Sequence, residues 1–266
     1  MCWRGLVLFA IERHGRPPPL RSKHPPDGCN SWAFFLDVDG TLIEIAETPD
    51  AVLLDMRLLG LVECLFRASG GATAMVSGRS IADLDRRLGR PDIPIAGQHG
   101  LERRDATGNT ILLAEPSGAL STVSMGLREL AERHSDLLFE DKGLTLSLHY
   151  RRAPALGGYL YRRVRQLVAS TSGLLVQHGK CVIEIKPSGF DKGSAISAYL
   201  AEPPFRDRIP VFIGDDVTDE NGFNTVNAFL GISIKVGRGR TCARYRLPDV
   251  TAVRAWLARA AQVTCT

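Results

Sequence analysis

The sequence lacks the long apolar run and the paired cysteines that mark membrane and secreted proteins. No apolar stretch in the 266 residues approaches the ~20 residues that span a bilayer, and residues 6–11 are too few for a signal-peptide core. The six cysteines form no C-x-x-C pair, and no histidine cluster accompanies them at zinc spacing. We therefore expect reduced thiols in a cytoplasmic protein without a membrane partner.

A strong positive charge is also missing from the part of the chain that can fold. The formal net charge is +4, and residues 1–30 alone hold five basic and two acidic side chains. A nucleic-acid groove concentrates basic side chains on the folded part of a protein, so we expect no nucleic-acid partner. Residues 12–31 are rich in Pro, Arg, Gly and Ser, which do not build a packed core. The sequence predicts a basic, loosely attached tail over residues 1–31 and ordered structure from about Trp32.

What the sequence does have is a regular alternation of short apolar runs and amphipathic stretches. Buried strands are predicted at residues 33–36, 72–76, 93–96, 210–213 and 232–236. Helices are predicted at residues 55–68, 80–88, 192–200 and 250–261. Short apolar strands that alternate with helices are typical of a doubly wound, mostly parallel sheet, so the expected fold class is α/β.

The middle of the chain follows another pattern. Helices at residues 121–133 and 156–170 alternate with strand pairs at residues 137–139 and 144–150, and at residues 174–177 and 182–185. This order predicts a small α+β unit with an antiparallel sheet. We expect a core formed by residues 32–114 and 187–266, interrupted by an α+β insertion at residues 115–186.

Two carboxylates stand at the end of the first predicted strand, in the sequence D-V-D-G-T. Side-chain alternation puts Asp37 and Asp39 on one side of the chain, at the end of the sheet where ligands gather. Two carboxylates there are costly without a cation, which indicates a divalent metal. One carboxylate can attack phosphorus and the other can exchange protons with the leaving alcohol and with water, while Thr41 offers a donor to the phosphate. The alternative is an Asp-rich turn that caps a helix.

Three further groups follow predicted strands or open predicted helices. Ser77 begins S-G-R, which suits a phosphate oxygen at a helix start or forms an ordinary turn. Lys192 stands at a predicted helix start, where the helix dipole disfavours a positive charge. It either neutralises a phosphate or is a solvated surface lysine. The acidic run at residues 215–220 offers oxygen ligands for Mg²⁺ or forms the acidic first turn of a helix. Together the groups supply the parts of a phosphoryl transfer.

In this order, D-x-D-G-T, S-G-R, an isolated lysine and G-D-D-x-x-D resemble the four motifs of the haloacid dehalogenase-like phosphatases over residues 32–262. The resemblance implies that Asp37 is the nucleophile and Asp39 the acid/base. It implies Mg²⁺ held by Asp37, the Asp39 carbonyl and the acidic run, whose members we rank as ligands in the order Asp215, Asp216, Asp219. The residues that it implies at the phosphoryl group are Val38, Ser77, Gly78, Arg79 and Lys192.

A narrower set of segments is similar to the trehalose-6-phosphate phosphatases. They are L-D-V-D-G-T-L-I-E-I-A-E-T-P, G-Q-H-G-L-E, H-Y-R, G-K-C-V-I-E-I-K-P, and residues 214–223 with the following V-G. In that family the α+β insertion is a cap over the sugar. The resemblance implies sugar contacts from Lys180 and Glu184, with Glu102 and Arg151 as further contacts. Lys180 and Glu184 are four residues apart in a predicted strand and share a face, which suits either hydroxyl binding or a surface salt bridge.

The resemblance implies Mg²⁺-dependent hydrolysis of trehalose 6-phosphate to trehalose and phosphate through an aspartyl-phosphate, without an obligate protein partner. Gln98 departs from the small residue usual in the family at its position, which bears on the sugar preference. A phosphatase of the same fold acting on another sugar phosphate, such as sucrose phosphate, is the nearest alternative. A signalling receiver domain is disfavoured by the chain length and the insertion. A non-catalytic sugar sensor on the same fold is the third.

Overall fold

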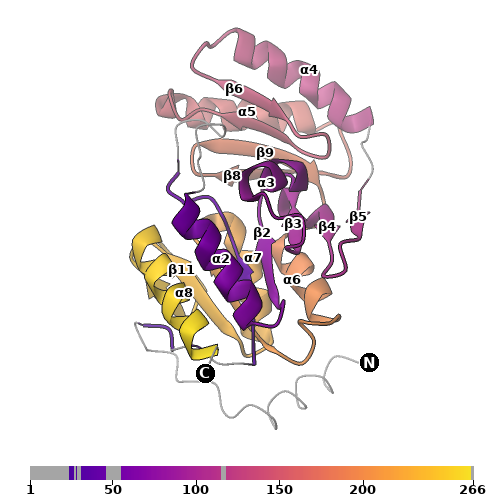
Figure 1. Ribbon diagram of the computed structural model, residues 1–266. Coiled ribbons are helices and arrows are strands. Elements are labelled where there is room, and N and C mark those ends of the chain that lie inside the picture. Colours follow the sequence, from indigo (N-terminus) through magenta and orange to yellow (C-terminus); the bar gives the residue numbers. More distant parts are fainter. Residues whose placement is uncertain (1–23, 27, 29–30, 46–54, 115–117, 265–266) are drawn as a thin grey trace.

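The computed structural model describes residues 24–26, 28, 31–45, 55–114 and 118–264. Figure 1 shows a larger unit of sheet and helices, with a smaller unit of sheet and helices stacked above it. Within these residues, no helix combines the length and the hydropathy needed to cross a membrane.

Strand β1 (Trp32–Leu36) lies in the middle of the larger sheet, and all five of its side chains are buried. Trp32, Phe34 and Leu36 belong to one apolar cluster, whereas Ala33 and Phe35 belong to a second one. Successive side chains of a strand point to opposite faces, so a strand covered on both faces is apolar at every position. This explains the unbroken apolar run that marked β1 in the sequence.

The larger sheet has eight strands in the order β12-β11-β10-β1-β2-β3-β4-β5. The strands from β12 to β3 in this order run parallel, and β4 and β5 are added antiparallel. The remaining strands are β2 (Thr73–Val76), β3 (Ile95–Gly97), β4 (Glu102–Arg104), β5 (Thr110–Leu112), β10 (Ile209–Gly214), β11 (Ile232–Val236) and β12 (Tyr245–Leu247). The expected mostly parallel α/β sheet is confirmed, although β4, β5 and β12 were not predicted.

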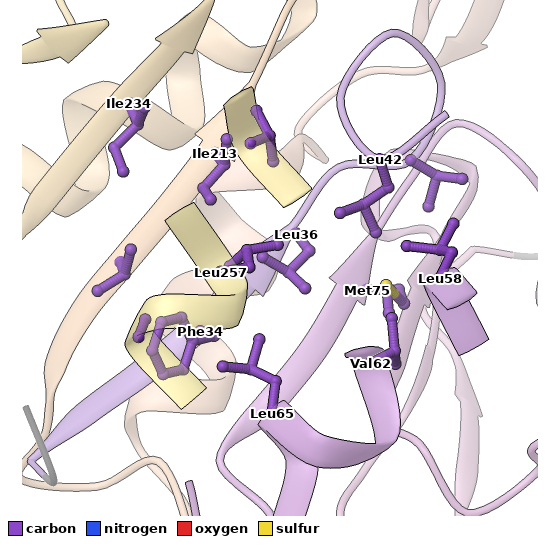
Figure 2. Packing of buried hydrophobic residues seen from close by; sticks show 14 of the residues in the cluster. Phe34, Leu36, Leu42, Leu58, Val62, Leu65, Met75, Ile213, Ile234 and Leu257 are labelled. Carbon is purple, nitrogen blue, oxygen red and sulfur yellow. The ribbon is translucent and has the colours of Figure 1, made fainter. Parts of the chain in front are cut away.

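Helices cover both faces of this sheet. On one face pack α2 (Met56–Ala68), α3 (Ile81–Leu88) and α8 (Val250–Thr264), and on the other pack α6 (Lys192–Leu200) and α7 (Glu220–Ala228). Figure 2 shows the first face, where β1 residues meet residues of α2 and α8; the labelled side chains include Phe34, Leu36, Leu58, Val62, Leu65 and Leu257. The two helix layers fix the sheet that carries the site.

The helices start where the sequence supplies a capping side chain. The carboxylate of Asp55 accepts a hydrogen bond from the backbone N–H of Leu58 at 2.8 Å, and Ser80 caps α3 in the same way. Asp191 and Ser194 form a reciprocal capping box that begins α6 at Lys192. Each cap satisfies a backbone donor that the first helical turn leaves free, which is why the predicted starts of these helices agree with the structure within a residue.

Residues 118–187, which we call the inserted unit, form a second sheet with the antiparallel order β6-β7-β9-β8. Its strands are β6 (Leu138–Asp141), β7 (Leu146–His149), β8 (Leu174–Gly179) and β9 (Val182–Pro187). Helices α4 (Gly118–Glu132) and α5 (Gly157–Val168) share a third apolar cluster with one face of this sheet. The helix, strand-pair, helix, strand-pair order expected from the sequence is therefore found.

Part of the stretch that was expected to be a loose tail lies against α8. Trp256 is 1% exposed, and its indole Nε1 donates to the carbonyl oxygen of Pro26 at 3.1 Å. A Cβ on Gly28 would stand 2.6 Å from the carbonyl oxygen of Ala260, so a glycine is needed there. Residues 1–23, 27 and 29–30 of the expected tail lie outside the described residues.

Removing residues 1–28 is expected to lower the melting temperature relative to removing residues 1–23 alone. The indole N–H of Trp256 would exchange its hydrogen bond with Pro26 for one with water, at a net cost of about 0.5–1.5 kcal/mol. Thermal unfolding of the two truncated chains, followed by circular dichroism, measures the difference. Equal melting temperatures would contradict a stabilising role for Pro26 and Gly28.

Candidate active site

The predicted phosphate and metal residues meet at the carboxyl ends of the central strands, opposite the inserted unit. Asp37 follows β1, Ser77 follows β2, Asp215 follows β10, and Lys192 begins α6. All four line a cavity of about 360 Å³, within the size range of small-molecule sites. Neighbouring parallel strands end at one edge of a sheet, so residues distant in sequence converge there.

Asp37 is a buried carboxylate held by two donors. It is 4% exposed; its Oδ1 accepts from Lys192 Nζ at 2.7 Å and its Oδ2 accepts from Thr41 Oγ1 at 3.1 Å. Burial raises the pKa of Asp37 well above its ordinary value, Lys192 opposes this rise, and the charges of Asp219 and Asp215 add to it. The carboxylate is therefore fixed in position but short of positive charge.

The positively charged side chain that contacts Asp37 is Lys192. Its ammonium also lies 2.6 Å from Asp219 Oδ1, and the Lys192 side chain is 3% exposed. Burial lowers the pKa of Lys192, but the charges of Asp219 and Asp37 outweigh burial and raise it above its ordinary value. The same two carboxylates offset the repulsion that a lysine meets at a helix N-terminus.

Three buried carboxylates form the part of the site that suits a metal ion. Asp37, Asp215 and Asp219 each bring one oxygen to within 4.8 Å of the others. Burial raises the pKa of Asp215, against the lowering effect of Lys180 and with a further rise from Asp219. A Cβ on Gly40 would overlap the Asp215 carboxylate, so the backbone after Asp39 approaches these oxygens closely. Hard oxygen ligands that repel one another in this way fit Mg²⁺.

The acidic run contributes to this cluster in a different order from the expected one. Asp219, ranked third as a ligand, joins Asp37 and Asp215, because the single turn η4 (Val217–Asp219) carries it back beneath Asp215. Its Oδ2 accepts from the backbone N–H groups of Asp215 and Asp216, both at 2.8 Å. Asp216, ranked second, instead accepts from the backbone N–H of Lys180 at 3.2 Å. Sequence spacing alone does not reveal such a turn.

Asp39, the expected acid/base, is paired with a residue that was expected to bind phosphate. Arg79 Nε lies 2.6 Å from Asp39 Oδ2, and Arg79 Nη2 lies 2.7 Å from Asp39 Oδ1. Arg79 Nη1 also donates to Asp83 Oδ2 at 2.7 Å, and the Arg79 backbone N–H donates to Ser77 Oγ at 3.2 Å. A bidentate pair of this kind holds both side chains in a defined geometry.

The expected sugar contacts divide into two groups. Lys180, Arg151 and Glu184 line the cavity, with the Lys180 ammonium paired to Asp215 and Arg151 Nη2 donating to the Lys180 carbonyl at 3.3 Å. The structure does not bring Glu102 to the cavity lining; its Oε1 accepts from the backbone N–H of Ile81 at 2.8 Å, at the start of α3. Gly78, which was expected at the phosphoryl group, also lines the cavity.

Val38 and Thr41 are buried in the loop that follows β1. Thr41 is 0% exposed, and its hydroxyl reaches Asp37 rather than the cavity surface. The side chain of Val38 belongs to the apolar cluster beneath α2, so this residue can meet a ligand through its backbone alone.

Several lining residues were not recognised from the sequence. They are Glu140, Lys142, His149 and His99. His149 Nε2 lies 2.9 Å from Glu140 Oε2, across the β6–β7 pair. His99 and His149 stand in the G-Q-H-G and H-Y-R segments, which gave a signal without a role, whereas Lys142 lies in a turn with no motif. The approach of Glu140, Lys142 and His149 to the cavity depends on how the inserted unit sits on the core.

Comparison with known proteins identifies the family. Residues 35–250 match the trehalose-phosphatase family. The chain belongs to this family. A trehalose-6-phosphate phosphatase of Escherichia coli is 41% identical over 232 residues, which cover 87% of this chain and 87% of that protein. A probable trehalose-phosphate phosphatase of Sinorhizobium fredii is 41% identical over 209 residues, 78% of each chain.

A solved structure shows the same fold in a member of the trehalose-phosphatase family. The C-terminal domain of a trehalose-6-phosphate phosphatase from C. albicans superposes with a TM-score of 0.78 at 21% identity, over 99% of this chain and 97% of that chain. The expected α/β fold of the haloacid dehalogenase type is confirmed. Membership of the family also confirms the resemblance found in the sequence and the enzyme class, a phosphatase.

Replacing Lys192 with Met is expected to lower the melting temperature in EDTA more at pH 7.5 than at pH 5. The variant leaves two buried carboxylates without their shared cation, a loss of about 3–5 kcal/mol when they are charged. The pKa of Asp37 is then raised further above its unfolded value, so stability that is present at low pH is lost as pH rises towards the folded pKa.

The control is Tyr199→Phe, because the buried Tyr199 hydroxyl is uncharged at both pH values and donates to the Arg104 carbonyl at 2.7 Å. Its loss of melting temperature is expected to be the same at the two pH values. A loss for Lys192→Met that does not depend on pH would contradict the electrostatic account of the site.

Proposed function

We propose that this chain hydrolyses trehalose 6-phosphate to trehalose and phosphate, with Mg²⁺, through an aspartyl-phosphate on Asp37. The observation that carries the proposal is the buried contact of Asp37 with Lys192 on the wall of a cavity that Lys180 and Glu184 of the inserted unit also line. The relatives that this chain covers over most of their length are named for this activity. The cytoplasmic location inferred from the unpaired thiols stays a prediction.

The first chemical step is an in-line attack by a carboxylate oxygen of Asp37 on phosphorus, as the bond from phosphorus to the sugar oxygen breaks. Thr41 and Lys192 each hold one oxygen of this carboxylate, which fixes the direction of attack. Lys192 and Ser77, which both line the cavity, are assigned to the phosphoryl oxygens. When bound, Mg²⁺ would be held by Asp37, Asp215 and the Asp39 carbonyl, with Asp219 in the same carboxylate cluster, and would supply positive charge to the phosphoryl group.

The proton steps belong to Asp39, which must first part from Arg79 and take up a proton from solvent. Asp39 protonates the departing sugar oxygen and then takes a proton from a water molecule that attacks the aspartyl-phosphate. Cleavage of the bond between phosphorus and the Asp37 oxygen releases phosphate and restores the carboxylate. Asp83 already shares Arg79, so the guanidinium keeps an acidic partner when Asp39 leaves it.

The inserted unit is proposed to act as the sugar-binding cap, with bounds close to residues 115–186. Its contacts with the core surround the cavity: the Lys180 ammonium meets Asp215, and the Lys180 backbone N–H meets Asp216. Closure over the sugar excludes bulk water from the phosphoryl group, which strengthens the electrostatic interactions of the site.

Phosphate release from a panel of sugar phosphates tests the substrate and the nucleophile. With Mg²⁺, trehalose 6-phosphate is expected to be the preferred substrate, and EDTA is expected to stop the reaction. Asp37→Asn should lower kcat by roughly 10⁴-fold or more. The control is Asp85→Asn, which should leave kcat nearly unchanged, because Asp85 lies on α3 and pairs with Arg104. Preference for another sugar phosphate would reject the substrate, and turnover by Asp37→Asn near the normal rate would reject the nucleophile.

The ligand order is tested by thermal shift on addition of Mg²⁺. Asp215→Asn is expected to abolish the rise in melting temperature, because Asp215 belongs to the buried carboxylate cluster. Asp216→Asn is expected to keep most of the rise, since its carboxylate contacts Lys180. The opposite result would restore Asp216 as the ligand.

A further inference from the structure

Two buried polar side chains join the core to the inserted unit beside the cavity. His99 lies in the turn η2 (Gln98–Gly100), between β3 and β4, and its Nε2 is 2.7 Å from Oε2 of Glu184 on β9. The two side chains are 5% and 9% exposed. The phosphoryl chemistry proposed above gives His99 no part, and the family resemblance gives Glu184 only a sugar contact.

The backbone around this contact adopts conformations that side chains disfavour. Gln98 and His99 have φ of 46° and 59°, so two successive residues with side chains lie in the left-handed region. Gly78, in the neighbouring loop after β2, leaves the necessary space, because a Cβ there would stand 2.8 Å from His99 Nε2. The glycine of S-G-R is therefore needed for the contact between His99 and Glu184.

Glu184 takes its hydrogen bonds from both units. Its Oε1 accepts from Lys142 Nζ and from Ser147 Oγ, each at 3.3 Å, and both donors belong to the inserted unit. Lys142 Nζ also donates to the Gly78 carbonyl of the core at 3.0 Å. His99 is the partner from the core, so its hydrogen bond exists only while the inserted unit sits on the core.

The direction of the hydrogen bond follows from the charge of Glu184. Burial raises the pKa of Glu184, but His99 and Lys142 outweigh burial and hold it well below its usual range. An ionised carboxylate only accepts hydrogen bonds, so the hydrogen stands on His99 Nε2. Burial lowers the pKa of His99, against the raising effect of Glu184. A neutral ring with its hydrogen on Nε2 is enough to make this contact.

We propose that His99 is a positioning residue for sugar recognition, which fixes the carboxylate of Glu184 at the cavity only when the inserted unit is closed on the core. This inference rests on the proposed function, because it takes Glu184 as a sugar contact. With the units apart, Glu184 keeps Lys142 and Ser147 but loses His99, and one carboxylate oxygen is free to turn. Selection of the sugar is then coupled to the closed arrangement, in which Asp37 and Lys192 line the same cavity as Glu184.

The test compares His99→Asn with His99→Gln. Asparagine tolerates left-handed backbone but is too short to reach Glu184, whereas glutamine places an N–H donor near the position of Nε2. With Mg²⁺, His99→Asn is expected to lower kcat/KM for trehalose 6-phosphate by about 10- to 100-fold, the effect of losing one hydrogen bond to a charged group. Turnover of p-nitrophenyl phosphate, which has no sugar, should change by less than about threefold, and His99→Gln should restore most of the loss.

Thr145→Val is the matched control. Thr145 is fully buried, and its hydroxyl donates to Gln98 Oε1 at 3.0 Å, so this variant removes another hydrogen bond between the two units without touching Glu184. Its preference for trehalose 6-phosphate over p-nitrophenyl phosphate should stay that of the unmodified chain. Equal losses on both substrates in His99→Asn, or a loss in Thr145→Val as large as in His99→Asn, would overturn the inference.

A readout without substrate separates this inference from the proposed function. Amide hydrogen exchange in residues 142–149 is expected to speed up in His99→Asn and to return towards normal in His99→Gln. If the unmodified chain does not turn over trehalose 6-phosphate, the proposed function fails, yet the exchange data still show whether His99 holds the closed arrangement. Unchanged exchange in His99→Asn would reject that role even in an active phosphatase.

Discussion

The ammonium of Lys192 between Asp37 and Asp219 is the interaction on which the site depends. It joins the end of β1, the start of α6 and the turn η4, which are far apart in the sequence, through hydrogen bonds of 2.7 and 2.6 Å. All three side chains are almost fully buried, so each charge has lost its water and must be compensated by the others. The apolar clusters on the two faces of the sheet hold the strands that bring these groups together, and they offset the cost of that burial.

In the inserted unit, one face of the sheet is apolar and the other is polar. Along β7, Leu146 and Leu148 enter the apolar cluster beneath α4 and α5, while Ser147 between them faces the cavity side. Along β9, Ile183 and Ile185 do the same on either side of Glu184. The unit therefore has a core of its own, and its named contacts with the larger unit are hydrogen bonds and ion pairs. Contacts of that kind can be broken without exposing the apolar core, which suits the cap role proposed for this unit.

Much of the architecture was predictable because its signals are local. Strand β1 is an unbroken apolar run, β2 and β10 are mostly apolar, and α2, α3 and α6 begin at capping side chains. Strands β4, β5 and β12 have three residues each, too few to show any period, and β4 includes buried Arg103 and Arg104. These two arginines can be buried because Glu202 and Asp85 pair with them. Their polarity in the sequence favours exposure, and only the tertiary structure supplies these partners. Helix α7 was not predicted as an element, although the acidic run before it was recognised as a possible first turn of a helix.

The sequence by itself determined the class of fold, the family and the residues proposed to carry the phosphoryl chemistry, since each of these depends on short motifs at the ends of strands. The tertiary structure alone decided which acidic residues converge, that Arg79 holds Asp39, that Glu102 supports α3, and that His99 meets Glu184. The physical reason is that a motif fixes the position of its own backbone, whereas hydrogen bonds and charge pairs depend on which other chain segment packs against it. Residues 85 positions apart, such as His99 and Glu184, have no relation in the sequence until the inserted unit rests on the core.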